Sequence, residues 1–346
     1  MDIVEKQWRD LYLFLQKLFI LLPLFALIPI INFLSFPVGK ERICAEQLLK
    51  GRTLYGDDAP FSQPLMDERL FQKFVIEGFA TTKHVVIFGS SRSGQISLTP
   101  YLNRYASFFN NNVNMADLND VMVMYGMYKK KNSSLPAVII VECSPWWLNK
   151  NYKAPGLWVT DDAWVTKVIS KIYQVYKVCS IGLLQIALKK NLQKIFGKQK
   201  DVNVPGARLL PDGQRIYPKS PNDKVLQSVL SLSQYSNIEK FNELNRKAMV
   251  EFEGFVKQLL NDGIRVLFFL PPYHPVAYKR LRANQIYDKV FEAQEFFIGC
   301  AQNFSIEVVG SYDPEACGCE ASDFSDWYHL YEISTEKIFK NVLGSL

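Results

Sequence analysis

This sequence contains few histidines and few cysteines, and its net charge is small. Its 346 residues include three histidines and six cysteines, and the formal net charge is +6. Six cysteines are too few for a disulfide scaffold in a chain of this length. They also supply no set of four ligands at metal-binding spacing, so we expect no structural zinc. The sequence has no zinc-finger spacing or other nucleic-acid motif, and we expect no nucleic-acid partner.

The cysteines leave the cellular compartment open. Cys143 and Cys300 lie in or beside apolar stretches, and we expect them to be buried thiols. Cys317 and Cys319 are close enough in sequence to form a strained small-loop disulfide if the domain faces an oxidising compartment. No pattern in the sequence calls for a metal or an organic cofactor, and we expect neither.

Charged residues are absent from residues 18–39, whose sequence is LFILLPLFALIPIINFLSFPVG. About 20 apolar residues are enough to cross a bilayer, and prolines such as Pro23 and Pro29 are tolerated in membrane-spanning helices. The apolar segment is long and no small-residue cleavage site follows it, which argues against a cleaved signal peptide. We therefore predict a short tail at 1–17 and one uncleaved transmembrane helix at 18–39. Basic residues on both sides leave its orientation undecided.

The rest of the chain is typical of one α/β domain at residues 83–346, joined to the anchor by a connector at 40–82. Apolar strands alternate with helices, which favours a parallel sheet. We predict strands at 84–88, 137–142, 266–270 and 306–309, a helix and a short strand within 95–110, and helices at 67–79, 115–131, 237–261, 276–303 and 333–342. Residues 151–235 are expected to form a helical elaboration of this domain.

Two segments are open to more than one interpretation. Residues 157–200 combine apolar residues at helical spacing with many lysines. They fit either a helical hairpin packed on the core or a basic amphipathic helix on an anionic membrane surface. The adjacent Trp146 and Trp147 follow a strand, and they form either a packed lid or an exposed binding surface.

The stretch that organises the domain runs from Val85 to Gly94 and has the sequence VVIFGSSRSG. Consecutive apolar residues suit a strand that is covered on both faces, and Gly89 permits a turn at its carboxyl end. Ligands bind at that edge of open α/β sheets. Ser91 is therefore a candidate nucleophile, and the alternative is that Ser90 or Ser91 is only the N-cap of a helix.

The base for such a serine must be one of three histidines. His84 begins a buried strand and is expected to be structural, while His274 follows a strand end but lies close to prolines on both sides. His329 follows Asp326 by three residues, just before the last helix. A turn of this length lets the carboxylate bond to one imidazole nitrogen while the other nitrogen faces the sheet edge. The alternative is an aspartate that caps the last helix.

These ordered motifs resemble the SGNH (GDSL-type) hydrolase superfamily. Gly89-Ser90-Ser91 occupies the place of its Gly-Asp-Ser motif, and Asp326 with His329 occupies that of its final Asp-x-x-His. FFLPPYHPVAY at 268–278 and GSYDPEACGCEASDFSD at 310–326 look like a membrane-anchored branch, similar to the D-alanyl transfer protein of teichoic acids and to alginate O-acetylation proteins.

The resemblance covers roughly residues 80 to 345. It implies a three-layer, flavodoxin-like α/β fold with a parallel sheet. It also implies that Ser91 is the nucleophile, His329 the base and Asp326 the group that orients the base.

Two departures from the family pattern concern the oxyanion site. Met115 stands where the second block has a glycine, and Glu142-Cys143-Ser144-Pro145 replaces the asparagine of the third block. One oxyanion donor is worth on the order of 3 kcal/mol, so an active enzyme needs replacements. The backbone N–H of Ser91 is one candidate. The side chains considered for the oxyanion or the substrate are those of Ser90, Arg92, Asn114, Ser144, Asn149 and His274.

The resemblance also implies a function and a location. It implies a serine-dependent acyltransferase in a bacterial cytoplasmic membrane, with the α/β domain on the periplasmic side. The acceptor would be a hydroxyl of a cell-surface polysaccharide or of its lipid-linked precursor, and the partner a membrane-bound O-acyltransferase. Two further hypotheses are a glycan esterase that uses the same site and a catalytically weakened scaffold protein. The sequence identifies neither the acyl group nor the glycan.

Overall fold

The computed structural model describes residues 3–35, 39–62, 66–102, 107–131, 134–152, 175–176, 178–195, 207–219, 222–230 and 238–340. The chain divides into two compact units. The first consists of residues 1–40, 63–66 and 159–203, and the second and larger one of residues 41–62, 67–158 and 204–346. All the site residues predicted from the sequence belong to the second unit.

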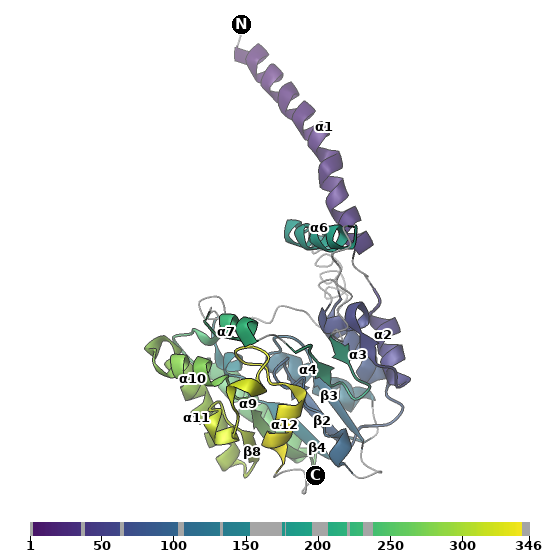
Figure 1. The fold of residues 1–346 in the computed structure, drawn as a ribbon. Helices are drawn as coiled ribbons and strands as arrows, with labels where there is room; N and C mark the ends of the chain where they lie inside the picture. The colour runs from purple at the N-terminus through teal and green to yellow at the C-terminus, as the bar shows by residue number, and fades with distance from the viewer. Residues whose placement is uncertain are drawn as a thin grey trace. The chain divides into compact units, whose positions relative to one another are not determined.

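A five-stranded parallel sheet forms the centre of the second unit (Figure 1). Its strands are β2 (Val85–Gly89), β3 (Phe108–Asn112), β4 (Val138–Glu142), β7 (Arg265–Leu270) and β8 (Glu307–Gly310), in the order β3-β2-β4-β7-β8. This is the strand order of flavodoxin-like folds, in which ligands bind at the carboxyl ends of the strands where the order reverses. Here the reversal lies between β2 and β4. The predicted parallel α/β fold is confirmed.

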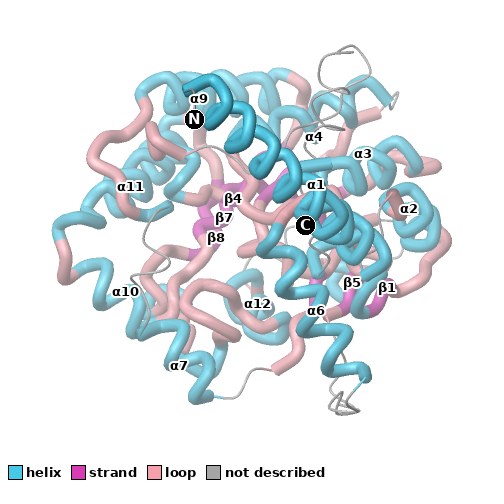
Figure 2. The backbone as a smooth tube through the Cα atoms, turned by 90° about the horizontal axis from the view of Figure 1, so that it is seen from above, coloured by secondary structure: helices cyan, strands magenta, loops and turns pink. Residues whose placement is uncertain are grey.

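Helices cover both faces of this sheet, and Figure 2 shows β4, β7 and β8 side by side beneath them. On one face, alternate strand residues such as Ile87 and Ile140 pack with Ile338 and Phe339 of α12 (Glu332–Phe339). On the other face, Phe268 contacts Phe252, at 5.3 Å between ring centroids. The helices on that second face are α4 (Leu118–Lys131), α9 (Arg246–Asn261) and α11 (Asp288–Asn303). Burial of both faces explains the apolar runs in the three central strands β2, β4 and β7.

Three predicted helices differ in the structure. The helix expected at 276–303 is divided into α10 (Pro275–Arg282), a 3₁₀ turn (Gln285–Tyr287) and α11, because the Asn284 side chain accepts a hydrogen bond from the N–H of Ile286 and starts a new turn. The helix expected from residue 237 begins at Arg246, where Asn245 caps it. Within 95–110, the described residues form a 3₁₀ turn (Thr99–Tyr101) in place of the expected helix, whereas the expected short strand is present as β3.

The segment 40–82, predicted as a connector, contributes two helices to the second unit. They are α2 (Glu41–Leu49) and α3 (Glu68–Gly78), and α3 is capped by Asp67. A buried ion pair between Arg69 and Asp120, with N···O at 2.6 Å, joins α3 to α4. A small antiparallel sheet of β1 (Leu54–Tyr55), β5 (Arg208–Leu209) and β6 (Arg215–Ile216), together with α7 (Asn222–Leu230), completes the unit.

The structure answers the sequence questions about the tryptophan pair and the cysteines. Trp146 and Trp147 are buried, and both indole N–H groups donate to the carbonyl of Ala116 at 2.9 Å. The packed interpretation of this pair is therefore confirmed. Cys143 and Cys300 are buried thiols as predicted, while the thiols of Cys317 and Cys319 are free.

The first unit contains α1 (Ile3–Ser35) and α6 (Ile181–Ile195). The Asn32 side chain donates to the carbonyls of Val178 (2.7 Å) and Ser180 (3.0 Å), which ties the two helices together. Within the described part of the chain, no helix is both long enough and apolar enough to cross a membrane. Residues 36–38 of the predicted anchor, and most of the segment 157–200, lie outside the described residues.

Candidate active site

Ser91 lies in the tight turn that follows β2. The turn is closed by backbone hydrogen bonds from Ser93 N–H to the Ser90 carbonyl and from Gly94 N–H to the Ser91 carbonyl, both 3.3 Å long. Ser90 is 0 % exposed, whereas Ser91 retains 7 % exposure. Of these two adjacent serines, Ser91 is therefore the one that an incoming reagent can reach.

Ser91, His329 and Asp326 form a continuous hydrogen-bonded chain. The Nε2 of His329 lies 2.9 Å from the Oγ of Ser91, and its Nδ1 lies 2.6 Å from Oδ2 of Asp326. A carboxylate only accepts hydrogen bonds, so the proton of a neutral ring resides on Nδ1. Nε2 is then free to accept the proton of the serine hydroxyl, which is the arrangement that activates serine nucleophiles.

The electrostatics keep Asp326 ionised. Burial alone would raise its pKa, but the adjacent His329 and the backbone N–H groups of Tyr328 and His329, at 2.9 and 2.8 Å from Oδ1, outweigh this effect. The pKa of Asp326 is consequently below the ordinary aspartate value. The imidazole of His329 also contacts two tyrosine rings, with centroids 4.1 Å away for Tyr328 and 5.8 Å away for Tyr217. These contacts restrict rotation of the ring.

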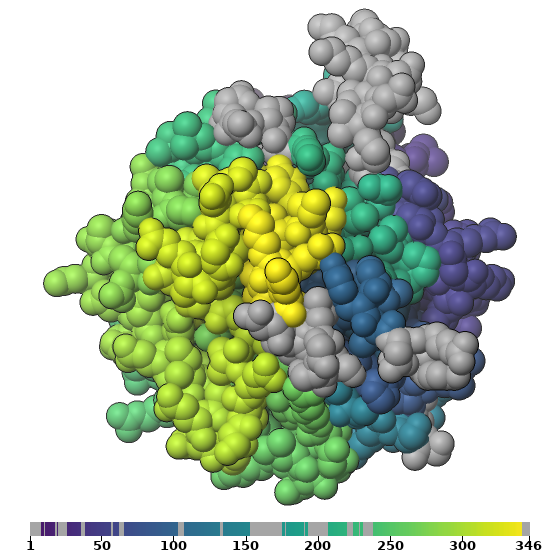
Figure 3. All heavy atoms as spheres, turned by 60° about the horizontal axis from the view of Figure 1, so that its bottom comes forward, coloured from purple at the N-terminus to yellow at the C-terminus, as the bar shows by residue number. Residues whose placement is uncertain are grey.

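A narrow loop brings Asp326 and His329 to the same side. Phe324 and Leu330 pair across it, and the N–H of Ser325 donates to the carbonyl of His329 at 2.9 Å. At the base of the loop, the carboxylate of Asp323 accepts from Ser334 at 2.8 Å and from Lys337 at 2.9 Å, both in α12. Figure 3 shows this yellow C-terminal region at the surface of the second unit. The loop is therefore anchored to a helix that packs on the sheet.

Glu142, at the end of β4, lies beneath the nucleophile turn and is completely buried. Its Oε2 accepts from the N–H groups of Ser90 (2.8 Å) and Ser93 (3.0 Å). Its Oε1 accepts from the hydroxyls of Ser90 (2.5 Å) and Ser144. In the sequence, Glu142 stood out only as a departure from the pattern that the motifs resemble. The available signal was an acidic residue at the end of a buried apolar strand, where a carboxylate needs specific donors.

Gly89 has no room for a side chain. An added Cβ would lie 2.4 Å from Oγ of Ser93 and 2.6 Å from both Cβ and Oε2 of Glu142. We expect Gly89→Ala to lower the free energy of unfolding by roughly 1–3 kcal/mol through overpacking, and to slow reactions at Ser91. Thermal unfolding measures the first effect. The matched control is Gly126→Ala in α4, where a Cβ meets open space and should stabilise the helix by up to about 1 kcal/mol. Equal effects at both positions would contradict this account of the turn.

Three hydrogen-bond donor groups near the turn have no acceptor among the described residues. They are the backbone N–H of Ser91, the backbone N–H of Met115 and the side-chain amide of Asn114, whose Oδ1 accepts from Nη1 of Arg215 at 2.6 Å. Met115 has φ = 52°, which is the left-handed conformation that favours glycine. The methionine thus adopts a backbone conformation that is more common for glycine. Asn112, at the end of β3, pairs in register with Gly89, which places this segment beside the turn.

The other candidate side chains are engaged elsewhere. The amide of Asn149 donates to the carbonyl of Ile238 at 3.0 Å, and the hydroxyl of Ser144 donates to Glu142. His274 caps α10 by accepting from the N–H of Val276 at 3.2 Å, and burial lowers its pKa despite the opposing charge of Asp326. None of these three is hydrogen-bonded to Ser91 or His329.

Arg92 points away from the serine into the protein. It is 1 % exposed, and its Nη2 donates to the carbonyls of Pro271 (2.7 Å) and Pro272 (3.0 Å). The guanidinium carbon lies 4.2 Å from the ring centroid of Tyr273, whose hydroxyl donates to Glu239 at 3.2 Å. Arg92 therefore links the nucleophile turn to the segment after β7. The sequence offered no signal for Glu239, because it lies in a polar stretch far from either motif.

Glu239 makes the stability of the protein depend on pH. Burial raises its pKa to about 8, even though Arg92 and Tyr273 act to lower it. A glutamate of the unfolded chain titrates near 4.5, so the folded state binds the proton more tightly. This contribution to stability is complete below about pH 4.5 and is lost as the pH rises through about 8.

Glu239→Gln should remove this dependence. Each pKa unit corresponds to about 1.4 kcal/mol, so we expect the wild type to lose a few kcal/mol between pH 5 and 9 relative to the variant. Urea unfolding of both proteins at several pH values measures this difference. Parallel stability curves for the two proteins would contradict the assignment.

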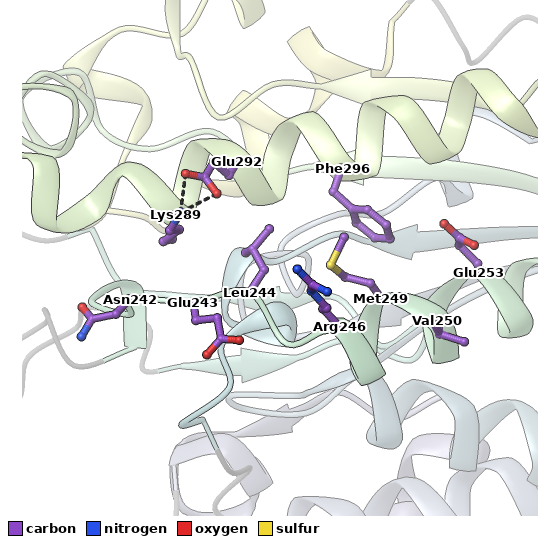
Figure 4. Close-up of a pocket in the computed structure, with 10 residues that line it drawn as sticks. All are labelled: Asn242, Glu243, Leu244, Arg246, Met249, Val250, Glu253, Lys289, Glu292 and Phe296. Carbon is purple, nitrogen blue, oxygen red and sulfur yellow. Dashed lines mark hydrogen bonds and ion pairs between the residues drawn. The ribbon is translucent and has the colours of Figure 1, made fainter.

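The surface near the triad contains a hollow of about 660 Å³. Its lining includes His274 and Phe324, as well as Tyr331 and Ile333 from the segment that follows the triad loop. Another hollow, of about 510 Å³, lies by α9 and α11 and contains the ion pair of Lys289 with Glu292 (Figure 4). Only the first of these two hollows borders the loop that carries Asp326 and His329.

In comparisons with known proteins, no family model and no curated protein matches the sequence. Among solved structures, a Bacteroides fragilis protein described as an acylhydrolase is similar over 76 % of this chain and 87 % of its own, with 10 % sequence identity and a TM-score of 0.36. In the described residues, no three histidine, cysteine or acidic side chains are grouped so that they could hold a metal ion.

Proposed function

We propose that this protein is a serine-dependent acyl-transfer enzyme. The observation that carries the proposal is the hydrogen-bonded chain from Ser91 Oγ through His329 to Asp326, with distances of 2.9 and 2.6 Å. A hydroxyl beside the acceptor nitrogen of an oriented imidazole is the structural signature of an activated serine. These three hydrogen-bonded side chains also lie at the carboxyl edge of the sheet, next to the reversal in strand order.

The reaction would proceed in two steps. Ser91 Oγ attacks the acyl carbonyl while His329 Nε2 takes the hydroxyl proton, and the ionised Asp326 stabilises the imidazolium. His329 then gives this proton to the leaving oxygen of the donor, and the acyl group remains on Ser91 as an ester. In the second step, His329 takes a proton from the acceptor hydroxyl, which attacks the ester. Return of the proton to Ser91 Oγ restores the starting state.

The negative charge that develops on the carbonyl oxygen needs donors. We propose the N–H groups of Ser91 and Met115 and the side-chain amide of Asn114 for this role. Their support is that each is without an acceptor in the described structure, and that Arg215 holds the Asn114 oxygen so that the NH₂ group is left to donate. A preorganised donor of this kind typically contributes 10²–10³-fold in kcat.

The acceptor and the location are also proposals. We propose a hydroxyl of a cell-surface polysaccharide as the acceptor, with the protein anchored by residues 18–39 in the cytoplasmic membrane and working with a membrane-bound O-acyltransferase on the periplasmic side. The support is the family resemblance of the motifs and the uncharged segment 18–39. In α1, apolar side chains such as Phe19 and Leu34 are each 79 % exposed, which suits an apolar surrounding.

Acyl transfer can be tested directly on the full chain in detergent. The protein is mixed with p-nitrophenyl acetate, with and without a panel of oligosaccharides. Mass spectrometry then measures the masses of the intact protein and of the sugars. An acetyl group on Ser91 that passes to a sugar supports the transferase. An acetyl-enzyme that releases only acetate supports an esterase and overturns the transferase. A folded protein with neither adduct nor product would overturn both and favour a scaffold.

A further inference from the structure

The carboxylate of Glu142 is fully enclosed, and it accepts hydrogen bonds from four donors. It bridges the ends of β4 and β2, two neighbouring parallel strands. One oxygen accepts two backbone N–H groups, and the other accepts two hydroxyls. A buried carboxylate with this many donors is held in one place, and it holds its donors in turn.

The hydrogen bonds of the turn leave one backbone amide unused. The N–H of Ser90 and the N–H of Ser93 donate to Glu142. The N–H of Arg92 donates to the Oγ of Ser90 at 3.1 Å, and that hydroxyl is itself oriented by Glu142. The N–H of Gly94 donates to the carbonyl of Ser91. Among residues 90–94, Ser91 alone has an N–H without an acceptor in the described structure.

We infer that Glu142 is a positioning residue: its carboxylate engages the competing amides of the nucleophile turn and so leaves the Ser91 N–H as the turn's one oxyanion donor. This inference rests on the proposed function, because it needs Ser91 to be the nucleophile. Glu142 acts through the turn and is no second base, since its oxygens bond to Ser90, Ser93 and Ser144 while the Ser91 hydroxyl bonds to His329.

A series of Glu142 variants tests this role. Glu142→Leu removes all the acceptors, and Glu142→Asp keeps the charge but withdraws it from the turn by one methylene. Glu142→Gln keeps one oxygen for the two backbone N–H groups, while the hydroxyls of Ser90 and Ser144 can reorient to accept from its NH₂ group. The matched control is Asp120→Asn in α4, a buried carboxylate that pairs with Arg69 of α3.

The readouts are the rate at which a fluorophosphonate labels Ser91 and the kcat and KM for p-nitrophenyl acetate, measured well below each unfolding midpoint. A misplacement of about 1 Å can cost on the order of 100-fold. We expect losses of that order in kcat for Glu142→Leu, at least tenfold for Glu142→Asp, and partial rescue by Glu142→Gln, with KM little changed. Asp120→Asn should lower the unfolding midpoint without changing the labelling rate.

The outcomes separate this inference from the proposed function. If wild-type protein is not labelled, the proposed function fails. If it is labelled and Glu142→Leu reacts at the same rate, the positioning role is wrong. Should Glu142→Leu not fold, Glu142→Asp decides the question, because an unchanged kcat in that variant overturns the role. A loss confined to KM would also overturn it, since it would place Glu142 in ground-state binding.

Discussion

Ser91→Ala is expected to abolish covalent labelling by a fluorophosphonate and to reduce kcat for acyl transfer by roughly 10⁶-fold, the order found when a triad nucleophile is removed. The reason is that Ser91 supplies the hydroxyl that is hydrogen-bonded to the imidazole of His329, with Oγ 2.9 Å from Nε2. Its neighbour Ser90 is fully buried and bonded to Glu142. No other hydroxyl can therefore take the place of Ser91 without rebuilding the turn.

The measurement is intact-protein mass after reaction with the probe, followed by peptide mapping of the adduct. Ser90→Ala is the informative comparison, because it removes a serine hydroxyl one residue away. We expect it to keep an adduct on Ser91, formed more slowly because Glu142 and the Arg92 N–H lose a partner. An adduct that persists in Ser91→Ala would show that the nucleophile lies elsewhere.

Substitutions of the other two triad members should have the next largest effects. His329→Ala removes the base and is expected to cost nearly as much as loss of the serine. Asp326→Asn should reduce kcat by roughly 10⁴-fold, as in other triads, because an amide at this position favours the wrong tautomer of the imidazole. Steady-state kinetics with p-nitrophenyl acetate measures both effects. A fall of less than tenfold in Asp326→Asn would mean that the carboxylate does not orient His329.

Asp326 also gives the triad a defined dependence on acid. Its pKa is lowered in the folded protein from an ordinary value of 3.8, so its contribution to stability is present above about pH 3.8 and is lost as the pH falls through the lowered value. Wild type and Asp326→Asn should therefore converge in stability at strongly acidic pH and differ at neutral pH. Chemical unfolding at a series of pH values checks this, and a constant difference would contradict it.

Parts of the fold could be predicted from the sequence because local pattern controls them. Uninterrupted apolar runs such as Val138 to Val141 are compatible with strands buried on both faces. Their order in the sheet and the exact ends of the helices depend on contacts between distant residues. The break at Asn284, for example, depends on one side-chain cap that competes with helix continuation. The transmembrane helix at 18–39 stays a prediction.

The residues of the site also fall into those that the sequence predicts and those that it does not. Ser91, Asp326 and His329 could be proposed from the sequence because short motifs with fixed spacing carry them. The roles of Glu142 and Arg215 could not, because each acts on residues that are distant in the chain, such as Ser90 and Asn114. The positive φ of Met115 could not be predicted from the sequence either, because residues other than glycine rarely adopt it.

By itself, the sequence determined a parallel α/β domain, the serine most suited to be a nucleophile and the Asp-x-x-His pair that could serve it. Only the tertiary structure decided that Ser91 and His329, 238 residues apart, lie within hydrogen-bond distance. It also decided that the Glu142 carboxylate, on the neighbouring strand, accepts hydrogen bonds from the N–H groups of Ser90 and Ser93. The physical reason is that spacing along the chain controls local turns, whereas hydrogen bonds across the sheet edge depend on strand order and register.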